Sequence, residues 1–368
     1  MKHIALAIGL ALAPLSLAGE AAWAAPPAAE APNFSAVTAY MDAGYRSLGL
    51  PGAALLVVKD GKVLYERYFG SYTANTVVPI ASSSKWLSAA VIMSLVDEGK
   101  IDLDAKIAKY LPDFTGQKGE MTIRQMFSHS SGLVDFPNDR ARWDYSITMA
   151  QYADRVAREG VMAAAPGTEV RYASASMQVV GAVAEKVTGK PWNQLFKERI
   201  AIPCDMPDTT YIRAPGTTLD PVDARQDEVR NPMLAGAARS SLRDYGHFLD
   251  MIANKGVYKG RRVLSEQAVR EMQKDQTGSL PLKRASNDRM GRVSHYGLGE
   301  WLDVQDKDGR TVQVSSPGAY GFRPWLNLDR NLYGVFMMQR KIGGPAIDDT
   351  FDPWKLIDLV HETVDARK

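Results

Sequence analysis

The predicted strands of this 368-residue chain are gathered near its two ends, and a long, mainly helical stretch separates them. Near the start, the apolar run 53–58 and the run 63–69 flank Asp60-Gly61, a pair that favours a hairpin turn. Near the end, the patterning predicts three further strands, over residues 311–316, 322–329 and 332–340. Because a sheet must bury at least one face, we expect these distant segments to form one antiparallel sheet with helices packed on it.

Apolar residues at helical spacing predict the elements that flank and separate these strands. The predicted helices cover residues 34–48, 82–99, 122–128, 147–158, 174–188, 191–199, 241–254 and 353–365. The fold class is therefore α/β, an antiparallel sheet flanked by helices with an inserted, mainly helical region. We place the α/β part in residues 34–100 and 236–368 and the inserted part in residues 101–235.

The first residues predict export. Met1-Lys2-His3 precedes an apolar run, and Ala22-Trp23-Ala24 is a small-x-small cleavage pattern, so we expect a signal peptide over residues 1–24, cut after about Ala24. An Ala/Pro-rich linker over residues 25–33 would then lead into the fold. Because no later stretch has the apolar length of a bilayer span, we expect a periplasmic or secreted protein without stable membrane insertion.

Composition excludes several classes of function. Lys and Arg number 44 and Asp and Glu 42, a net charge of +2 without a basic stripe, which argues against nucleic acid as a partner. The single cysteine, Cys204, cannot form an intrachain disulfide. The five histidines lack the spacing of metal ligands, so we expect neither a metal nor an organic cofactor. The sequence predicts no particular oligomeric state.

Ser82 and Lys85 form the only Ser-x-x-Lys spacing in the chain, at the predicted start of the helix over residues 82–99. Positions three apart lie on one face of a helix, so the two side chains are expected to be neighbours. A serine hydroxyl becomes a good nucleophile when a neighbouring base takes its proton, and a lysine can be that base. The alternative is a serine run that only caps the helix.

Several segments in the same order resemble the serine hydrolases of the β-lactamase and penicillin-binding-protein superfamily, in particular class C enzymes with their related esterases and peptidases. The resemblance runs from about Phe34 to the C-terminal helix and implies a β-lactamase/transpeptidase-like fold. The segments that carry it are Ser82–Lys85, Ile101–Asp104, Tyr110–Pro112, Thr122–Leu133 with its His-x-Ser-Gly-Leu-like turn at His129, Pro166–Trp192 and Met233–Ser241. The rival Ser-His-Asp scheme lacks support, since no Gly-x-Ser-x-Gly elbow occurs.

The resemblance assigns roles to the segment around Tyr172. By that match, Tyr172 is the second proton-transfer group beside Ser82 and Lys85, and a phenol at this place could relay a proton to the leaving group and later activate water. A tyrosine that merely packs at the start of the next helix is the alternative. The family usually has Asn where this chain has Ser174, so Ser174 is a candidate substrate-binding residue with a shorter reach.

The third family motif, a strand ending in a cation, any residue and Gly, matches Ser316-Pro317-Gly318. Gly318 would allow a close approach to substrate, and the N–H groups of Ser82 and Ala319 would form the oxyanion hole. Ser316 supplies no cation for a substrate carboxylate, which lowers the expectation of β-lactam or C-terminal peptide recognition. Arg323 could substitute for that cation, or it could simply be a solvated strand residue.

The resemblance therefore predicts a serine hydrolase that forms an acyl-enzyme on a small ester, amide or peptide substrate. Carboxylic esters are favoured, ahead of D-amino-acid peptides or other amides and of β-lactams. A hypothesis from another class is a non-catalytic, penicillin-binding-like sensor of cell-wall fragments. The complete set of Ser82, Lys85 and Tyr172 argues against that sensor, because a binding protein has no need of all three.

Overall fold

The computed structural model describes residues 32–137, 141, 144–211, 229–284, 295–340 and 351–366. The predicted signal peptide over residues 1–24 and most of the predicted linker lie outside the described residues. The division into an α/β part and an inserted part remains a prediction.

A seven-stranded antiparallel sheet forms the centre of the protein, in the order β2-β1-β13-β12-β11-β10-β9. Its strands are β1 (Gly52–Lys59), β2 (Lys62–Gly70), β9 (His295–Tyr296), β10 (Trp301–Gln305), β11 (Thr311–Ser315), β12 (Phe322–Asn327) and β13 (Leu332–Met338). The hairpin and the three late strands are confirmed, and β1 pairs with β13 as expected of distant segments. The sequence patterning missed β9, which is short, and β10, whose pairing with β11 is interrupted by register shifts.

The predicted helices occur in the predicted order, and two further helices, over residues 116–119 and 266–272, were not predicted. The helices are α1 (Ser35–Ser47), α2 (Ser84–Asp97), α3 (Gly116–Gly119), α4 (Ile123–Phe127), α5 (Met149–Glu159), α6 (Ala175–Thr188), α7 (Trp192–Phe196) with a π-helical turn (Lys197–Ala201), α8 (Leu242–Ala253), α9 (Glu266–Met272) and α11 (Pro353–Asp365). Short strand pairs join β3 (Val77–Pro79) to β5 (Arg239–Ser241), β4 (Val170–Arg171) to β8 (Leu282–Arg284) and β6 (Val257–Tyr258) to β7 (Arg261–Arg262), and a 3₁₀ turn covers Ile107–Lys109.

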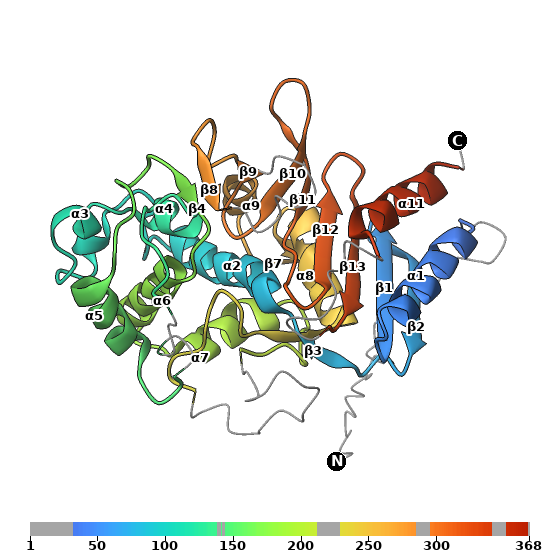
Figure 1. Ribbon diagram of the computed structural model, residues 1–368, viewed down its shortest axis with the longest axis horizontal. Coiled ribbons are helices and arrows are strands. Elements are labelled where there is room, and N and C mark those ends of the chain that lie inside the picture. The colour runs from blue at the N-terminus through green and yellow to red at the C-terminus, as the bar shows by residue number, and fades with distance from the viewer. Residues whose placement is uncertain are drawn as a thin grey trace, which may run out of the picture.

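Side chains of β1 alternate between two separate hydrophobic cores. Ala54 and Leu56 belong to the larger core, which includes α2 and α8, whereas Leu55 and Val57 pack with α1 and α11. Figure 1 shows α1 and α11, from opposite ends of the fold, lying together beside the sheet, and α3 to α7 grouped at the far end of the molecule. The sheet is therefore covered on both faces, and α2 lies on its inner face, where it joins the two groups of elements.

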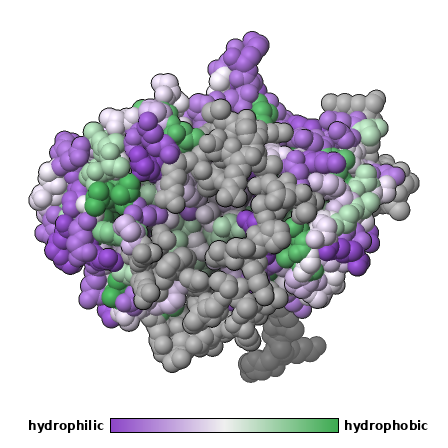
Figure 2. Space-filling model, viewed as in Figure 1, coloured by the Kyte–Doolittle hydropathy of each residue, from purple (hydrophilic) through white to green (hydrophobic). Residues whose placement is uncertain are grey.

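The surface that can be described is mostly polar. On the face seen in Figure 2, hydrophobic residues form small areas between hydrophilic ones. Among the described residues, the exposed large apolar side chains are those of Val161, Ile202 and Leu282. No helix in this described part of the chain is both long and apolar enough to cross a membrane.

Asp244 is a buried carboxylate that ties α8 to the preceding loop. Its carboxylate accepts hydrogen bonds from the Asp208 N–H and the Thr209 hydroxyl, each at 2.8 Å. Burial outweighs these bonds and raises the pKa of Asp244 to about 6 from the ordinary 3.8. Because the native state holds this proton more tightly than the unfolded chain, Asp244 costs stability as the pH rises from about 4 to 6, and the full cost remains above 6.

We expect Asp244→Asn to be more stable than the wild type at pH 7.5, by roughly 2–3 kcal/mol if its amide oxygen keeps both hydrogen bonds. The advantage should shrink toward zero at pH 4, where the wild-type carboxyl is protonated as well. Urea unfolding at the two pH values measures the difference. An advantage of equal size at both pH values would show that the charge of Asp244 is not its cause.

Candidate active site

Ser82 lies in a 3₁₀ turn, η1 (Ala81–Ser83), that leads into α2. The helix predicted over residues 82–99 therefore begins two residues later than expected, at Ser84. Ala81, directly before Ser82, has a φ of +45°, a left-handed conformation that a non-glycine residue rarely adopts. Such strain costs about 1–3 kcal/mol and persists only where the surroundings fix it. Here it occurs at the turn that presents Ser82.

Three serines follow one another at this turn, and their surroundings distinguish them. Ser83 and Ser84 are fully buried, whereas Ser82 is half-buried. The Ser83 hydroxyl donates to the Ser316 carbonyl at 2.5 Å, and the Ser84 hydroxyl donates to the Ala81 carbonyl at 2.6 Å. The hydroxyls of Ser83 and Ser84 therefore hold the turn together, and Ser82 is the serine of the three that remains accessible.

Lys85 is the partner of Ser82, and the predicted contact at a spacing of three is present. The Lys85 side chain is only 2% exposed, and its Nζ lies 3.1 Å from the Ser82 Oγ. Nζ also donates to the Ala235 carbonyl at 2.7 Å. Ala235 lies in the segment Met233–Ser241, which the sequence analysis matched to the family without assigning it a contact. The sequence could not reveal that its backbone holds Lys85, because a carbonyl group has no residue signature.

Tyr172 lies between β4 and α6, and its ring reaches Lys85. The Lys85 Nζ is 4.6 Å from the centre of the Tyr172 ring, a cation–π distance. The Tyr172 ring also stacks on Trp301 at 5.6 Å between centroids and lies 4.3 Å from the ring of His129. The Lys85 amine thus joins Ser82, three residues before it, to Tyr172, which is far away in the sequence.

Ser174 stands at the start of α6 and is half-buried, but its side chain makes no capping hydrogen bond. Asp135 caps the helix instead. Its Oδ1 accepts the N–H groups of Ser174 at 2.7 Å and Ala175 at 2.8 Å. A carboxylate at a helix N-terminus stabilises the exposed N–H groups there. The sequence analysis missed Asp135, because it is 39 residues from the helix that it caps.

The segment after β11 contacts the turn of Ser82 directly. A side chain at Gly318 would lie 2.1 Å from the Ile80 carbonyl oxygen, so only glycine allows this approach of the two backbones. The Gly318 N–H donates to the Phe322 carbonyl at 2.7 Å. The next residue, Ala319, is exposed at the bend. The close contact sets the position of the Ala319 N–H relative to Ser82.

Ser316 does not face the open side of this site. It is 3% exposed, and its hydroxyl donates to the backbone carbonyls of Gly299 at 3.2 Å and Ser82 at 3.4 Å. Its side chain therefore braces the backbone beneath the nucleophile. Both of these acceptors lie inside the protein, and contact of Ser316 with substrate stays a prediction.

Arg323 lies on the other face of the sheet. Side chains alternate along β12, so Phe322 packs inward, against Tyr245, and Arg323 points toward α11. The Arg323 guanidinium lies 4.4 Å above the Trp354 ring and is 7% exposed. Neither predicted alternative describes this position, since Arg323 is neither beside Ser82 nor solvated.

Arg340, which the sequence analysis did not select, is a cation beside the Gly318 bend. It follows β13, its backbone N–H donates to the Tyr320 carbonyl at 2.9 Å, and its Nε donates to the Ala319 carbonyl at 3.2 Å. Only the pairing of β13 with β12 brings it there. No local motif signals the contact, because 21 residues separate Arg340 from Ala319.

Burial shifts the pKa values of two ionisable groups near the site in the direction of their uncharged forms. Burial, and then the nearby carboxylate of Asp303, raises the pKa of Glu300 well above its ordinary value. Burial, and then the charge of Lys85, lowers the pKa of His129 well below its ordinary value. The described polar contacts of Lys85 are a hydroxyl, a carbonyl and an aromatic ring.

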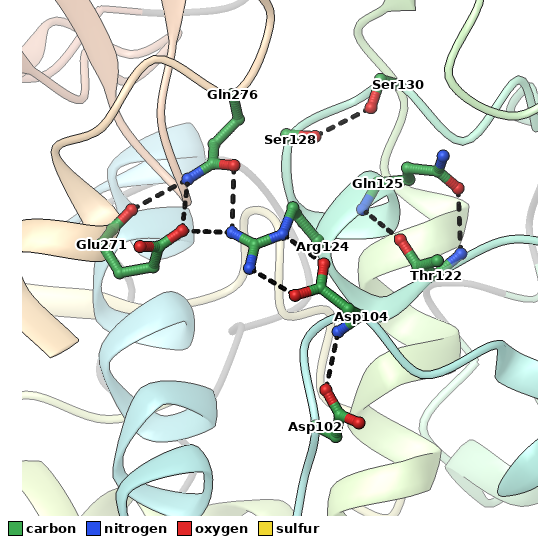
Figure 3. Close-up of polar contacts among 9 residues, drawn as sticks. All are labelled: Asp102, Asp104, Thr122, Arg124, Gln125, Ser128, Ser130, Glu271 and Gln276. Atoms are coloured by element: carbon green, nitrogen blue, oxygen red, sulfur yellow. Dashed lines mark hydrogen bonds and ion pairs between the residues drawn. The ribbon is translucent and has the colours of Figure 1, made fainter.

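An ion-pair network fixes the helix α4, which precedes the His129 turn. Figure 3 shows the Arg124 guanidinium between Asp104 on one side and Glu271 with Gln276 on the other. The hydrogen bond from Arg124 is the largest factor that lowers the pKa of Asp104. Glu271 lies on α9, which ends at Met272, so the network ties the segment around Asp104 to the segment that leads back into the sheet.

An antiparallel sheet with a serine and a lysine three residues apart at the start of its inner helix defines the serine hydrolases of the β-lactamase fold. The Beta-lactamase family model matches residues 35–353, so this chain belongs to that family. Among the described residues, no group of three or more His, Cys, Asp or Glu could hold a metal ion.

The chain is similar to proteins whose names give several activities. It is 25% identical over 341 residues to the D-alanyl-D-alanine-carboxypeptidase/endopeptidase AmpH of Escherichia coli strain K12, covering 81% of each chain. A beta-lactamase candidate from Bacteroides dorei DSM 17855, whose crystal structure is known, is 31% identical, with a TM-score of 0.79 over 91% of this chain and 99% of that one. A family VIII carboxylesterase shares the fold at 20% identity and a TM-score of 0.71, over 90% of this chain and 98% of that one.

Proposed function

We propose that this protein is an exported serine hydrolase that works through an acyl-enzyme on Ser82 and acts on carboxylic esters. The observation that carries the proposal is the contact of the Ser82 hydroxyl with the Lys85 amine at 3.1 Å, beside the ring of Tyr172. The accessibility of Ser82 compared with Ser83 and Ser84 supports the choice of nucleophile. The substrate is a small molecule, and no cofactor takes part in the proposed steps.

In the first half of the reaction, the Ser82 Oγ bonds to the ester carbonyl carbon as its proton passes to a neutral Lys85 amine. The carbonyl oxygen becomes an oxyanion, which the N–H groups of Ser82 and Ala319 would hold. The bond to the leaving alkoxide then breaks, and Tyr172 delivers a proton to that oxygen. In the second half, water attacks the acyl carbon, the same groups move the protons in reverse order, and Ser82 is released.

The preference for esters rests on the charges around the bend at Gly318. The residue at the end of β11 is Ser316, whose hydroxyl is engaged with backbone carbonyls and carries no charge. Arg323, the other candidate anchor for a substrate carboxylate, packs on Trp354. A charge-assisted hydrogen bond contributes about 1.5–3 kcal/mol, so a substrate that relies on a carboxylate anchor loses roughly ten- to hundred-fold in transition-state binding.

Short-chain p-nitrophenyl esters should therefore have a kcat/KM at least about ten-fold above that of nitrocefin, because they need no carboxylate anchor. Steady-state assays with both substrates on one preparation measure the ratio. A kcat/KM for nitrocefin equal to or above that of the esters would contradict the ester preference. Stoichiometric acylation without any turnover would instead support the non-catalytic sensor.

A D-amino-acid carboxypeptidase is the second candidate, and Arg340 is the observation that favours it. Its guanidinium sits beside the Ala319 carbonyl, where it could bind the terminal carboxylate of a peptide, and the relative AmpH is named as such a peptidase. In that case Arg340→Met should lower kcat/KM for a D-Ala-D-Ala peptide at least about ten-fold. The kcat/KM for p-nitrophenyl acetate should stay within two-fold of the wild-type value. Arg340→Lys should keep part of the peptide activity. Equal losses on both substrates would contradict the anchoring role.

A further inference from the structure

His129 is buried beside Tyr172, yet the proposed reaction assigns it no step. It is 1% exposed, and it contacts all three residues of the segment 171–173. Its carbonyl accepts the Arg171 N–H at 2.8 Å, its Nδ1 accepts the Ala173 N–H at 3.3 Å, and its ring lies 4.3 Å from that of Tyr172. One residue thus holds the backbone on both sides of Tyr172 and packs on the ring between them.

The backbone of His129 is suited to this arrangement. Its φ is +62°, in the left-handed region, where Asn, Asp and His occur more often than other side chains. The left-handed turn allows the carbonyl and the ring of the same residue to reach Arg171 and Ala173 together. The network of Arg124 in Figure 3 holds α4, which ends two residues earlier at Phe127.

The hydrogen bond to Nδ1 also determines the chemical form of the ring. Because Nδ1 accepts a hydrogen bond, the proton of the neutral imidazole is on Nε2, and this nitrogen is buried without a partner among the described residues. A second proton would have to displace the Ala173 N–H from Nδ1 and would put a cation near Lys85. The low pKa of His129 agrees with a ring that stays neutral.

We infer that His129 is a positioning residue for Tyr172, which it holds against Lys85 by binding the backbone on both sides of the tyrosine and packing on its ring. The inference rests on the proposed proton-transfer role of Tyr172. It predicts that His129 contributes to turnover only through Tyr172. Misplacing a catalytic group by about 1 Å can cost up to roughly a hundred-fold in rate, which sets the expected size of the effect.

The test is a double-mutant cycle with His129→Phe and Tyr172→Phe, assayed on p-nitrophenyl acetate. Phe keeps a ring but removes the acceptor for the Ala173 N–H, so we expect kcat to fall ten- to hundred-fold with KM within about three-fold. In the Tyr172→Phe background, the same change should cost less than about two-fold. His129→Asn, which keeps an acceptor near the Nδ1 position and tolerates a positive φ, should restore kcat to within a few-fold of the wild type.

His247→Phe is the control, because His247 is half-buried, lies 5.3 Å from a tyrosine ring and donates through Nδ1 to the Asp205 carbonyl at 2.8 Å, but sits on α8 beside Tyr258. It should leave kcat unchanged at a comparable loss of melting temperature. Equal losses from His129→Phe in both backgrounds, or a wild-type kcat in His129→Phe, would overturn the inference. If His129→Phe does not fold, the cycle is run with His129→Gln and judged in the same way.

The outcome separates this inference from the proposed function. A Tyr172→Phe variant with wild-type kcat would refute the role of Tyr172 and with it any need to position that residue. A large loss in Tyr172→Phe together with additive losses in the double mutant would leave the proposed function intact and refute the inference about His129 alone.

Discussion

Ser82→Ala should lower kcat for p-nitrophenyl acetate by about 10⁴-fold or more and should abolish covalent labelling by a fluorophosphonate. Removal of the nucleophile stops acylation, and only the slow reaction with water, assisted by the remaining site, is left. The fold should persist, because the Ser82 side chain is half-buried and its recorded contact is with Lys85. Far-ultraviolet circular dichroism and melting temperature establish that the variant is folded.

Ser94→Ala is a matched control for this change. Ser94 lies on α2, the helix that follows the turn of Ser82, and its hydroxyl donates to the Val91 carbonyl of that helix at 2.7 Å. It should retain wild-type turnover and labelling. Labelling that survives in Ser82→Ala would remove Ser82 from the reaction and direct attention to Ser83 or Ser84.

Lys85→Met is expected to have an effect nearly as large, about 10³-fold or more on the acylation rate. Met has a similar length and no proton-accepting nitrogen, so the Ser82 hydroxyl keeps its proton when it meets the substrate. Tyr172→Phe should lower kcat by about 10²-fold or more, the size typical of a positioned acid–base group. Stopped-flow measurement of p-nitrophenol release separates the acylation rate from the steady state.

The two losses should be far from additive, since groups that act as one proton-transfer unit lose most of their effect when any member is removed. In the Lys85→Met background, Tyr172→Phe should therefore cost less than about three-fold. A double mutant whose loss equals the product of the single losses would show that Tyr172 acts independently of Lys85. A near-normal kcat in Tyr172→Phe would make this tyrosine a packing residue of the cluster with Trp301.

The parts of the fold that the sequence predicted well depend on neighbours along the chain. The hairpin β1–β2 follows from a turn pair and two apolar runs, and the contact of Ser82 with Lys85 follows from their spacing. The helix start was misplaced by two residues because the strained turn at Ala81 is fixed by distant groups, such as the Ala238 N–H that donates to the Ser84 hydroxyl. Serines at 82 to 84 are equally good caps in the sequence alone.

The parts that the sequence could not predict depend on pairing across the sheet. Arg323 follows the Gly318 bend closely in the sequence, but side chains alternate along β12, and its side chain lies on the sheet face that carries Trp354. A shift of one residue in the strand register would have placed it on the opposite face. Arg340 reaches the bend only because β13 pairs with β12. The strands β9 and β10 were missed because neither gives a clear alternation of apolar and polar residues. β9 has two residues, and β10 has five and pairs with β11 through register shifts.

The most direct test of the account is mass spectrometry of the intact protein after exposure to a fluorophosphonate, followed by peptide mapping of the adduct. Attack by the nucleophile forms an oxygen–phosphorus bond and releases fluoride, so each molecule should gain one phosphonyl group, mapped to Ser82. Labelling should slow by about 10³-fold or more in Lys85→Met, in which the hydroxyl has no base. An adduct on Ser83, on Ser84 or on any residue outside this turn, or a labelling rate that Lys85→Met leaves unchanged, would contradict it.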